Sequence, residues 1–218
     1  MRRAVRTLVV ALVALMPVNA AHATGEDPVE DSTATTYVFP FSRVAVRYSR
    51  DHLHYPATDV YGCYAKVHAP TSGVIGQVRR KDKWVEDVDA PGTRGGLTIT
   101  LLGDDGVRYY FSHLGRVKVR TGQVVAPGHW IGVMGSSGNA RRTQCHTHIG
   151  MSRICPNAEF RLLQGEIWPW RYLDAWRKGV QLSPRKEKNA IVRTSPNACF
   201  EATADARADA ANARRNGD

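Results

Sequence analysis

The sequence predicts a mainly β fold, a compact antiparallel sheet or barrel, followed by a short helical extension. Short runs rich in β-branched and aromatic residues recur between Tyr37 and Ser152, and glycine, proline or aspartate bounds each of them. No run in this region has the length and period of a long helix. At 218 residues, the chain is long enough for one domain with appendages.

The chain begins with the layout of a secretory signal peptide. Three arginines precede an apolar run from Leu8 to Met16, and small residues follow as far as Ala23. The apolar run is too short to span a bilayer, and no cysteine lies near the cleavage point to carry a lipid. We therefore expect cleavage after Ala23 and a location outside the cell or in the cell envelope. Residues 24–36 are polar and predict a flexible lead-in.

The strands are predicted from turn residues between apolar runs. The clearest hairpin joins Leu97–Leu102 to Val107–Phe111 through the turn GDDG. The segment VHAPTSGVIGQV predicts two short strands, GQVVAPGHWIGVMGSSGN two more, and THIGMS another. So many short strands with tight turns favour an antiparallel sheet without an internal long helix.

The pattern changes after Cys155. The segment IWPWRYLDAWRKGVQLSP contains three tryptophans and one short helical stretch, about Trp170 to Lys178, which Gly179 ends. We expect this aromatic extension to pack on the sheet. The last sixteen residues are of low complexity and are predicted to be frayed or partly helical. The expected organisation is a signal peptide (1–23), a lead-in (24–36), a β domain (37–155), a Trp-rich extension (156–200) and a low-complexity tail (201–218).

Net charge bears on location and partners. Removal of residues 1–23, with three arginines and no acid, lowers the net charge from +10 to +7. A basic exported protein suits an anionic envelope polymer. The basic residues are scattered and no nucleic-acid motif is present, so no nucleic-acid partner is expected. No transmembrane segment is predicted either, and we expect a monomer.

Eight histidines are candidates for chemistry. His22 leaves with the signal peptide, while His68 and His129 have no acidic or histidine neighbour and are predicted to be structural or exposed. Zinc hydrolysis needs three ligands from His, Asp or Glu and an open position for water, and the helical H-E-x-x-H motif is absent. In QCHTHIGM, strand alternation places two histidines on one face. The five remaining candidates are His52, His54, His113, His146 and His148.

Four segments together resemble the lysostaphin/LytM-type zinc metallopeptidases: RDHLHYPATD, YYFSHLGRV, VRTGQVVAPGHWIGVMGSSGNA and CHTHIGM. The resemblance runs in order from about Tyr37 to Ser152. Its YPATD segment and Trp-rich tail look most like a secreted actinobacterial branch. The resemblance implies an antiparallel β scaffold with a substrate groove over the sheet. It also implies one zinc ion and cleavage of peptide stems or cross-bridges in bacterial peptidoglycan.

The resemblance also implies roles for individual residues. Asp59 and His148 match zinc ligands, and His113 and His146 match catalytic histidines. The family's usual spacing would put the first zinc ligand at position 55, which is Tyr55 here. Two histidines remain open for that position: His52, which the YPATD branch favours, and His54. One of His113 and His146 would help to deprotonate the water and the other would stabilise the oxyanion, in an order left open.

The four cysteines of an exported protein predict disulfides, and no C-x-x-C pair suggests a zinc site instead. Four cysteines allow three pairings. If the strands of Asp59 and His148 are antiparallel neighbours with these residues opposite each other, Cys63 faces the residue beside Cys145. We therefore expect Cys63–Cys145 and Cys155–Cys199, with Cys145–Cys155 as the main competitor.

The expected function is that of a secreted zinc endopeptidase acting on peptidoglycan peptides. The alternative is a non-catalytic wall-binding or amidase-activating module on the same fold, which the unusual spacing of the first ligand leaves open. A biotinyl- or lipoyl-type carrier is a third reading, from VHAPTSGVIGQV and TGQVVAPGHWIGV. The sequence offers no lysine in the usual context for such a carrier.

Overall fold

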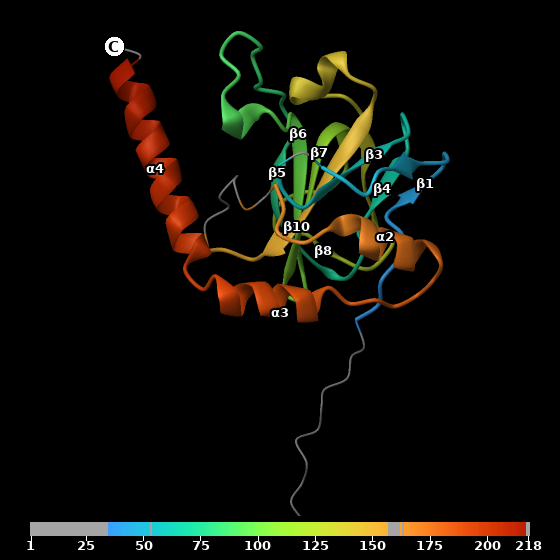
Figure 1. Ribbon diagram of the computed structural model, residues 1–218. Helices are drawn as coiled ribbons and strands as arrows, with labels where there is room; N and C mark the ends of the chain where they lie inside the picture. Colours follow the sequence, from blue (N-terminus) through green and yellow to red (C-terminus); the bar gives the residue numbers. More distant parts are fainter. Residues whose placement is uncertain (1–34, 53, 157–161, 163, 217–218) are drawn as a thin grey trace, which may run out of the picture. The chain divides into compact units, whose positions relative to one another are not determined.

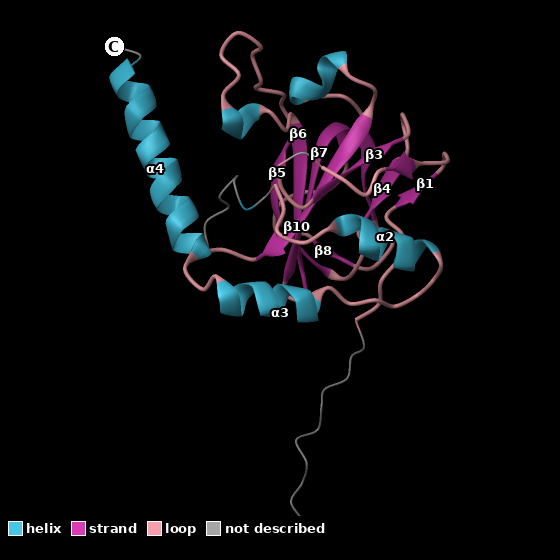
Figure 2. Cartoon of the chain, viewed as in Figure 1, coloured by secondary structure: helices cyan, strands magenta, loops and turns pink. Residues whose placement is uncertain are grey.

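The computed structural model describes residues 35–52, 54–156, 162 and 164–216 (Figure 1). The expected signal peptide and most of the expected lead-in lie outside the described residues. The described part contains a ten-stranded sheet, and three α-helices follow its last strand (Figure 2). None of the described helices is both long enough and apolar enough to cross a membrane.

The strand and helix bounds confirm the predicted mainly β fold. The strands are β1 (Phe41–Ser42), β2 (Arg47–Tyr48), β3 (Ala57–Tyr61), β4 (Lys66–His68), β5 (Gly73–Arg79), β6 (Leu97–Gly103), β7 (Val107–Val117), β8 (Val124–Val125), β9 (Trp130–Met134) and β10 (His146–Arg153). Short 3₁₀ turns cover Pro91–Thr93 and Gly138–Arg142, and the α-helices are α2 (Pro169–Arg177), α3 (Arg185–Thr194) and α4 (Ala198–Asn216).

The sheet is antiparallel, and its longest strand organises it. The order is β1-β4-β9-β7-β10-β3-β2. In addition, β6 pairs with β7, and β5 pairs with β6. The first half of β7 pairs with β10 and its last residues pair with β9, while β6 pairs along the other edge. The predicted hairpin of 97–102 with 107–111 is therefore present, and β7 continues well beyond it.

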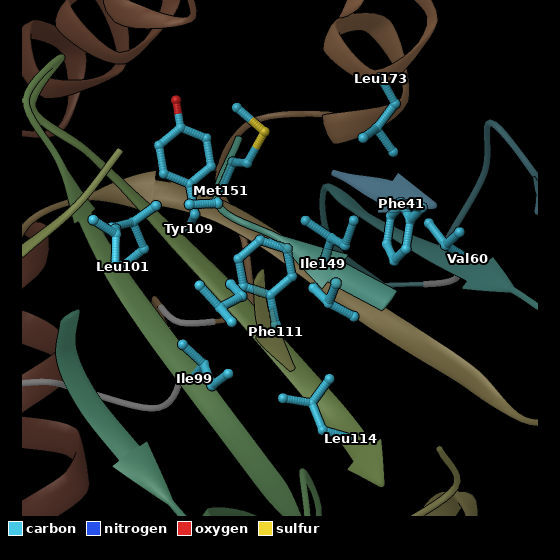
Figure 3. Packing of buried hydrophobic residues seen from close by; sticks show 14 of the residues in the cluster. Phe41, Val60, Ile99, Leu101, Tyr109, Phe111, Leu114, Ile149, Met151 and Leu173 are labelled. Atoms are coloured by element: carbon cyan, nitrogen blue, oxygen red, sulfur yellow. The ribbon is translucent and has the colours of Figure 1, made fainter. Parts of the chain in front are cut away.

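Strand alternation separates a core face from an open face. On β7 and β10, Tyr109, Phe111, Ile149 and Met151 are buried in the apolar core (Figure 3). The residues that alternate with these along each strand face the other way, and on β10 they include His146 and His148. The core face is thus filled with apolar side chains, and the opposite face is available for a site.

The Trp-rich extension covers the core. Tyr172, Leu173 and Trp176 of α2 are buried in the same apolar cluster, and Leu173 lies beside the sheet residues in Figure 3. The Trp176 ring stacks on Tyr37, with 5.3 Å between ring centroids. The helix expected at Trp170 to Lys178 is present as α2, and Gly179 after it has a φ of 75°. The helix α3 was not predicted, and α4 is a continuous helix where only a frayed or partly helical tail was expected.

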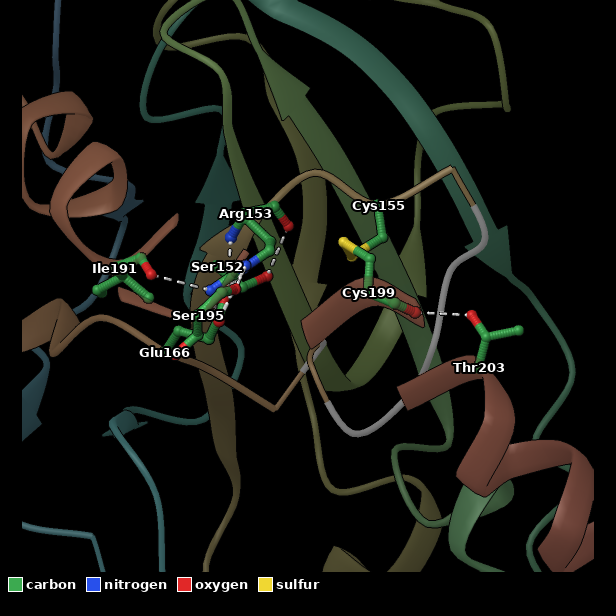
Figure 4. The surroundings of a disulfide bond; sticks show 8 residues. All are labelled: Ser152, Arg153, Cys155, Glu166, Ile191, Ser195, Cys199 and Thr203. Carbon is green, nitrogen blue, oxygen red and sulfur yellow. Dashed lines mark hydrogen bonds and ion pairs between the residues drawn. A yellow bond between two sulfur atoms is a disulfide. The ribbon is translucent and has the colours of Figure 1, made fainter. Parts of the chain in front are cut away.

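Both expected disulfides are present. Cys63–Cys145 joins the end of β3 to the start of β10, and Cys155–Cys199 joins the chain after β10 to α4 (Figure 4). The register between β3 and β10 places His148 opposite Asp59, which is the pairing from which the first disulfide was predicted. Near the second disulfide, Arg153 forms an ion pair with Glu166 and donates hydrogen bonds to the carbonyls of Ile191 and Ser195.

Candidate metal centre and active site

Three potential metal ligands meet on the open face of the sheet. His52, Asp59 and His148 each present a ligand atom, and these atoms all lie within 4.8 Å of one another. The register brings Asp59 and His148 together, with 3.0 Å between Oδ1 of Asp59 and Nδ1 of His148. His52 reaches them from the segment before β3, and its ring centroid lies 5.3 Å from that of His148. Of the two histidines left open for the first ligand position, the structure thus brings His52 into the group.

The hydrogen bonds of this group indicate that a cation fits it. Nδ1 of His52 is buried and has no hydrogen-bond partner in the described part of the chain. Nδ1 of His148 faces the Asp59 carboxylate while its Nε2 lies 3.1 Å from the carbonyl oxygen of Gln164. A neutral imidazole has only one N–H and cannot donate to both acceptors. If Nε2–H donates to Gln164, the lone pair on Nδ1 points at the carboxylate, and a cation between them satisfies both.

The charges in the group agree with a metal site. Burial raises the pKa of Asp59, but in the metal-free protein a hydrogen bond from Nδ1–H of His148 and the charges of the nearby histidines outweigh burial and hold this pKa below its usual value. Burial, and then the charge of His148, lower the pKa of His52. A carboxylate and two neutral imidazoles are a donor set that zinc prefers, and the carbonyl of Gln164 orients one of the rings.

His113 reaches the open face through a break in the regular strand. Leu97 of β6 pairs with Leu114, but Ile99 pairs with Phe111, so Ser112 and His113 both lie opposite Thr98. This is a β-bulge, and His113 within it has a φ of 58°, a left-handed conformation that is rare for residues other than glycine. The bulge turns the His113 side chain to the same groove as Ser112, instead of into the core.

The two remaining histidines are held by backbone carbonyls. Nδ1 of His113 lies 2.9 Å from the carbonyl oxygen of Ser137, and Nδ1 of His146 lies 2.8 Å from that of Gln144. Since a carbonyl can only accept, each Nδ1 carries the proton and each Nε2 is left for other contacts. The two rings are 4.8 Å apart between centroids. Burial lowers the pKa of His113 to about 4, so this ring is neutral near pH 7.

A groove of about 430 Å³ adjoins these residues. Its lining includes His113 and His148 together with Tyr55, Arg79, Tyr110 and Asn139. The end of the loop 80–95 contributes Pro91, Gly92, Arg94 and Gly95 to this lining, and the loop is fastened to the turn at 138–142. Asp82 accepts a hydrogen bond from the backbone N–H of Gly138 at 2.8 Å and forms an ion pair with Arg141.

Three groove residues were not singled out from the sequence as parts of a site. Tyr55 packs on the His52 ring at 4.4 Å between centroids, Gln164 contacts His148, and Arg79 lines the far end of the groove. Gln164 acts through its carbonyl, which no side-chain pattern can indicate. His54 lines the groove but lies outside the three-residue metal group. His68 and His129 lie away from the site. His68 forms hydrogen bonds with Ser42 and with the carbonyl of Gly128, and His129 forms one with Gln123.

Comparison with solved structures gives matches to peptidases with related folds. The lytM protein of Ruminococcus gnavus is 20% identical; the match covers 67% of this chain and 62% of that one, with a TM-score of 0.50. The present chain thus matches less than two thirds of that protein. The catalytic domain of lysostaphin from Staphylococcus simulans is 23% identical; the match covers 60% of this chain and 92% of that one, with a TM-score of 0.44. No curated protein matches the chain.

The family assignment comes from the sequence itself. The model of peptidase family M23 matches residues 48–158. That match covers all three residues of the metal group, the bulge at His113 and the histidine pair in CHTHIG. The chain therefore belongs to peptidase family M23.

Proposed function

We propose that the protein is an exported zinc endopeptidase that hydrolyses peptide bonds in bacterial peptidoglycan. The observation that carries the proposal is the group formed by His52, Asp59 and His148, next to a groove lined by His113, whose ring contacts that of His146. Membership in a peptidase family supports the reaction class. Two disulfides and a basic charge support an oxidising location near an anionic wall.

His52, Asp59 and His148 would hold the zinc ion. When bound, zinc would supply Lewis acidity and bring the pKa of a water molecule in the site towards neutrality. The carbonyl of Gln164 keeps the His148 ring oriented, and Tyr55 packs on the ring of His52. The protein thus supplies donors from two paired strands, β3 and β10, and from the segment before β3, with a supporting carbonyl.

His113 and His146 would handle the protons. His113 is neutral, and its unprotonated Nε2 can accept a proton from the attacking water. His146, with Nδ1–H fixed on Gln144, would donate from Nε2 to the developing oxyanion when its ring is protonated. The groove would bind the peptide in an extended form across both rings.

Digestion of purified peptidoglycan tests the proposal. We expect the wild-type protein to release new muropeptides, identified by mass spectrometry, and the His148→Ala variant to release none. His129→Ala, which changes an exposed histidine outside the groove, serves as the control and should match wild type. Equal product release by wild type and His148→Ala would refute the proposal. Wild-type protein that binds zinc but releases no product would instead indicate the non-catalytic alternative.

A further inference from the structure

The end of the groove away from the metal group carries an arginine. Arg79 lies on β5 opposite Thr98 of β6, Thr98 faces the bulge at Ser112 and His113 of β7, and Ser112 lies opposite His148. Arg79 is therefore three strands from His148 along one row across the sheet. Neighbouring strands are about 4.8 Å apart, so the two backbones are about 14 Å apart along the groove floor.

Arg79 is partly buried, and its guanidinium has no hydrogen-bond or ion-pair partner among the described residues. Its charge acts on the neighbouring Tyr110. Two nearby arginines, in contrast to Arg79, have hydrogen-bond partners within the protein. Arg94 also lines the groove, but Asp89 binds it through two contacts of 2.9 and 2.6 Å, and Arg80 donates to the carbonyls of Val117 and Val119.

Among the described residues that line the groove, no acidic side chain is present to neutralise this charge. Asp59 belongs to the metal group and is not part of this lining. A guanidinium matches a carboxylate with two parallel hydrogen bonds, and partial removal from water strengthens such a pair. The position of Arg79 therefore suits an anionic group on a bound molecule.

We propose that Arg79 binds a free carboxylate of the peptide substrate, about four residues from the bond that is cleaved, as about 14 Å divided by a rise of about 3.3 Å per extended residue implies. The inference rests on the proposed peptidase function and specifies its substrate class. Stem peptides with free carboxylates fit this groove. A bridge made only of glycine has no side-chain carboxylate to place there.

Binding to a matched pair of ligands tests the inference. Muropeptides are compared with the same muropeptides after their carboxylates have been converted to amides. Calorimetry with metal-free protein prevents turnover and prevents a carboxylate from binding to zinc. We expect wild type to bind the carboxylate form about tenfold or more tightly than the amide form, as loss of a charge-assisted hydrogen bond implies. Arg79→Gln should lose this preference, and Arg79→Lys should keep part of it.

Arg120→Gln is the control, because it removes one charge from an exposed arginine outside the groove, and it should keep the full preference. In the zinc-loaded protein, Arg79→Gln should raise KM for the carboxylate form and leave kcat unchanged. Equal wild-type binding of both forms, or an unchanged preference in Arg79→Gln, would overturn the role of Arg79. Carboxylate-selective binding without any cleavage would support that role and refute the proposed peptidase function.

Discussion

At the scale of single residues, the first metal ligand depends on which histidine of the segment RDHLHYPATD turns inward. His52 lies against His148 and Tyr55, and its buried Nδ1 lacks a partner in the described part of the chain. His54 is exposed and outside the metal group. Two histidines separated by one residue therefore have different surroundings, although the sequence alone leaves both open.

Replacing His52 and His54 one at a time by alanine distinguishes which of them binds the metal. We expect His52→Ala to reduce bound zinc to below about a tenth of an equivalent, because a site with only two protein ligands binds zinc weakly. His54→Ala should retain about one equivalent, since His54 supplies no ligand atom to the group. Elemental analysis of the purified variants measures both values. Zinc loss in His54→Ala with full zinc in His52→Ala would reverse the assignment.

The low pKa of His113, about 4, predicts a pH dependence of folding. An unfolded histidine titrates near about 6.5, so between these two values the unfolded state binds more protons than the folded state. The neutral ring thus contributes stability above about pH 6.5, and this contribution is lost as the pH falls towards about 4. Urea unfolding of metal-free protein at several pH values should show a shallower decline for His113→Gln than for wild type. Parallel pH profiles would contradict the buried neutral ring.

At the scale of elements, strand periodicity and one register explain most of the site. Alternation along β10 correctly predicts that His146 and His148 share a face, and their separation from Ile149 and Met151 follows from it. The same rule fails for His113, because simple alternation from Tyr110 and Ser112 would send it into the core. The bulge that redirects it depends on pairing with β6, and such tertiary features are not written in local sequence. Only the resemblance to known peptidases indicated His113.

The two disulfides should affect the protein differently. Cys63–Cys145 closes a separation of 82 residues and Cys155–Cys199 one of 44. Loop-closure entropy predicts that loss of either costs about 4 kcal/mol of unfolding free energy. Cys145 directly precedes His146, so the double variant Cys63→Ala/Cys145→Ala should also lose activity at temperatures where it is folded. The double variant Cys155→Ala/Cys199→Ala should remain active. Urea unfolding measures the stability of both double variants, and peptidoglycan digestion measures their activity. Equal activities in the two variants would argue against a positioning role for the first disulfide.

At the scale of the whole molecule, the extension after the sheet is part of the core. The sequence predicted the aromatic packing of α2 but not α3, whose residues are mostly polar. Ile191 of α3 packs against the apolar cluster, and Glu187 accepts a hydrogen bond from Tyr172. The helix α4 was similarly hidden by its low complexity. Helices whose burial is small leave little hydrophobic pattern in the sequence, so their presence depends on contacts that a sequence does not display.

Trp176→Ala tests the contribution of the extension. Trp176 is buried against Tyr37 and the core, so its truncation should cost about 3–5 kcal/mol of unfolding free energy. Trp170, which is only partly buried beside Arg50, offers a control in the same helix, and its truncation should cost clearly less. Thermal or urea unfolding measures both. Equal losses would show that α2 does not complete the core through Trp176.

The central claim is that one zinc ion in the group of His52, Asp59 and His148 makes this M23 peptidase active. Its most direct test is a zinc titration of chelator-treated protein, with muropeptide release measured after each addition. We expect no activity without metal, followed by a rise in proportion to added zinc that levels off at about one equivalent, because the protein has a single catalytic site. Full activity in the metal-free protein, or no recovery after one equivalent has bound, would contradict it.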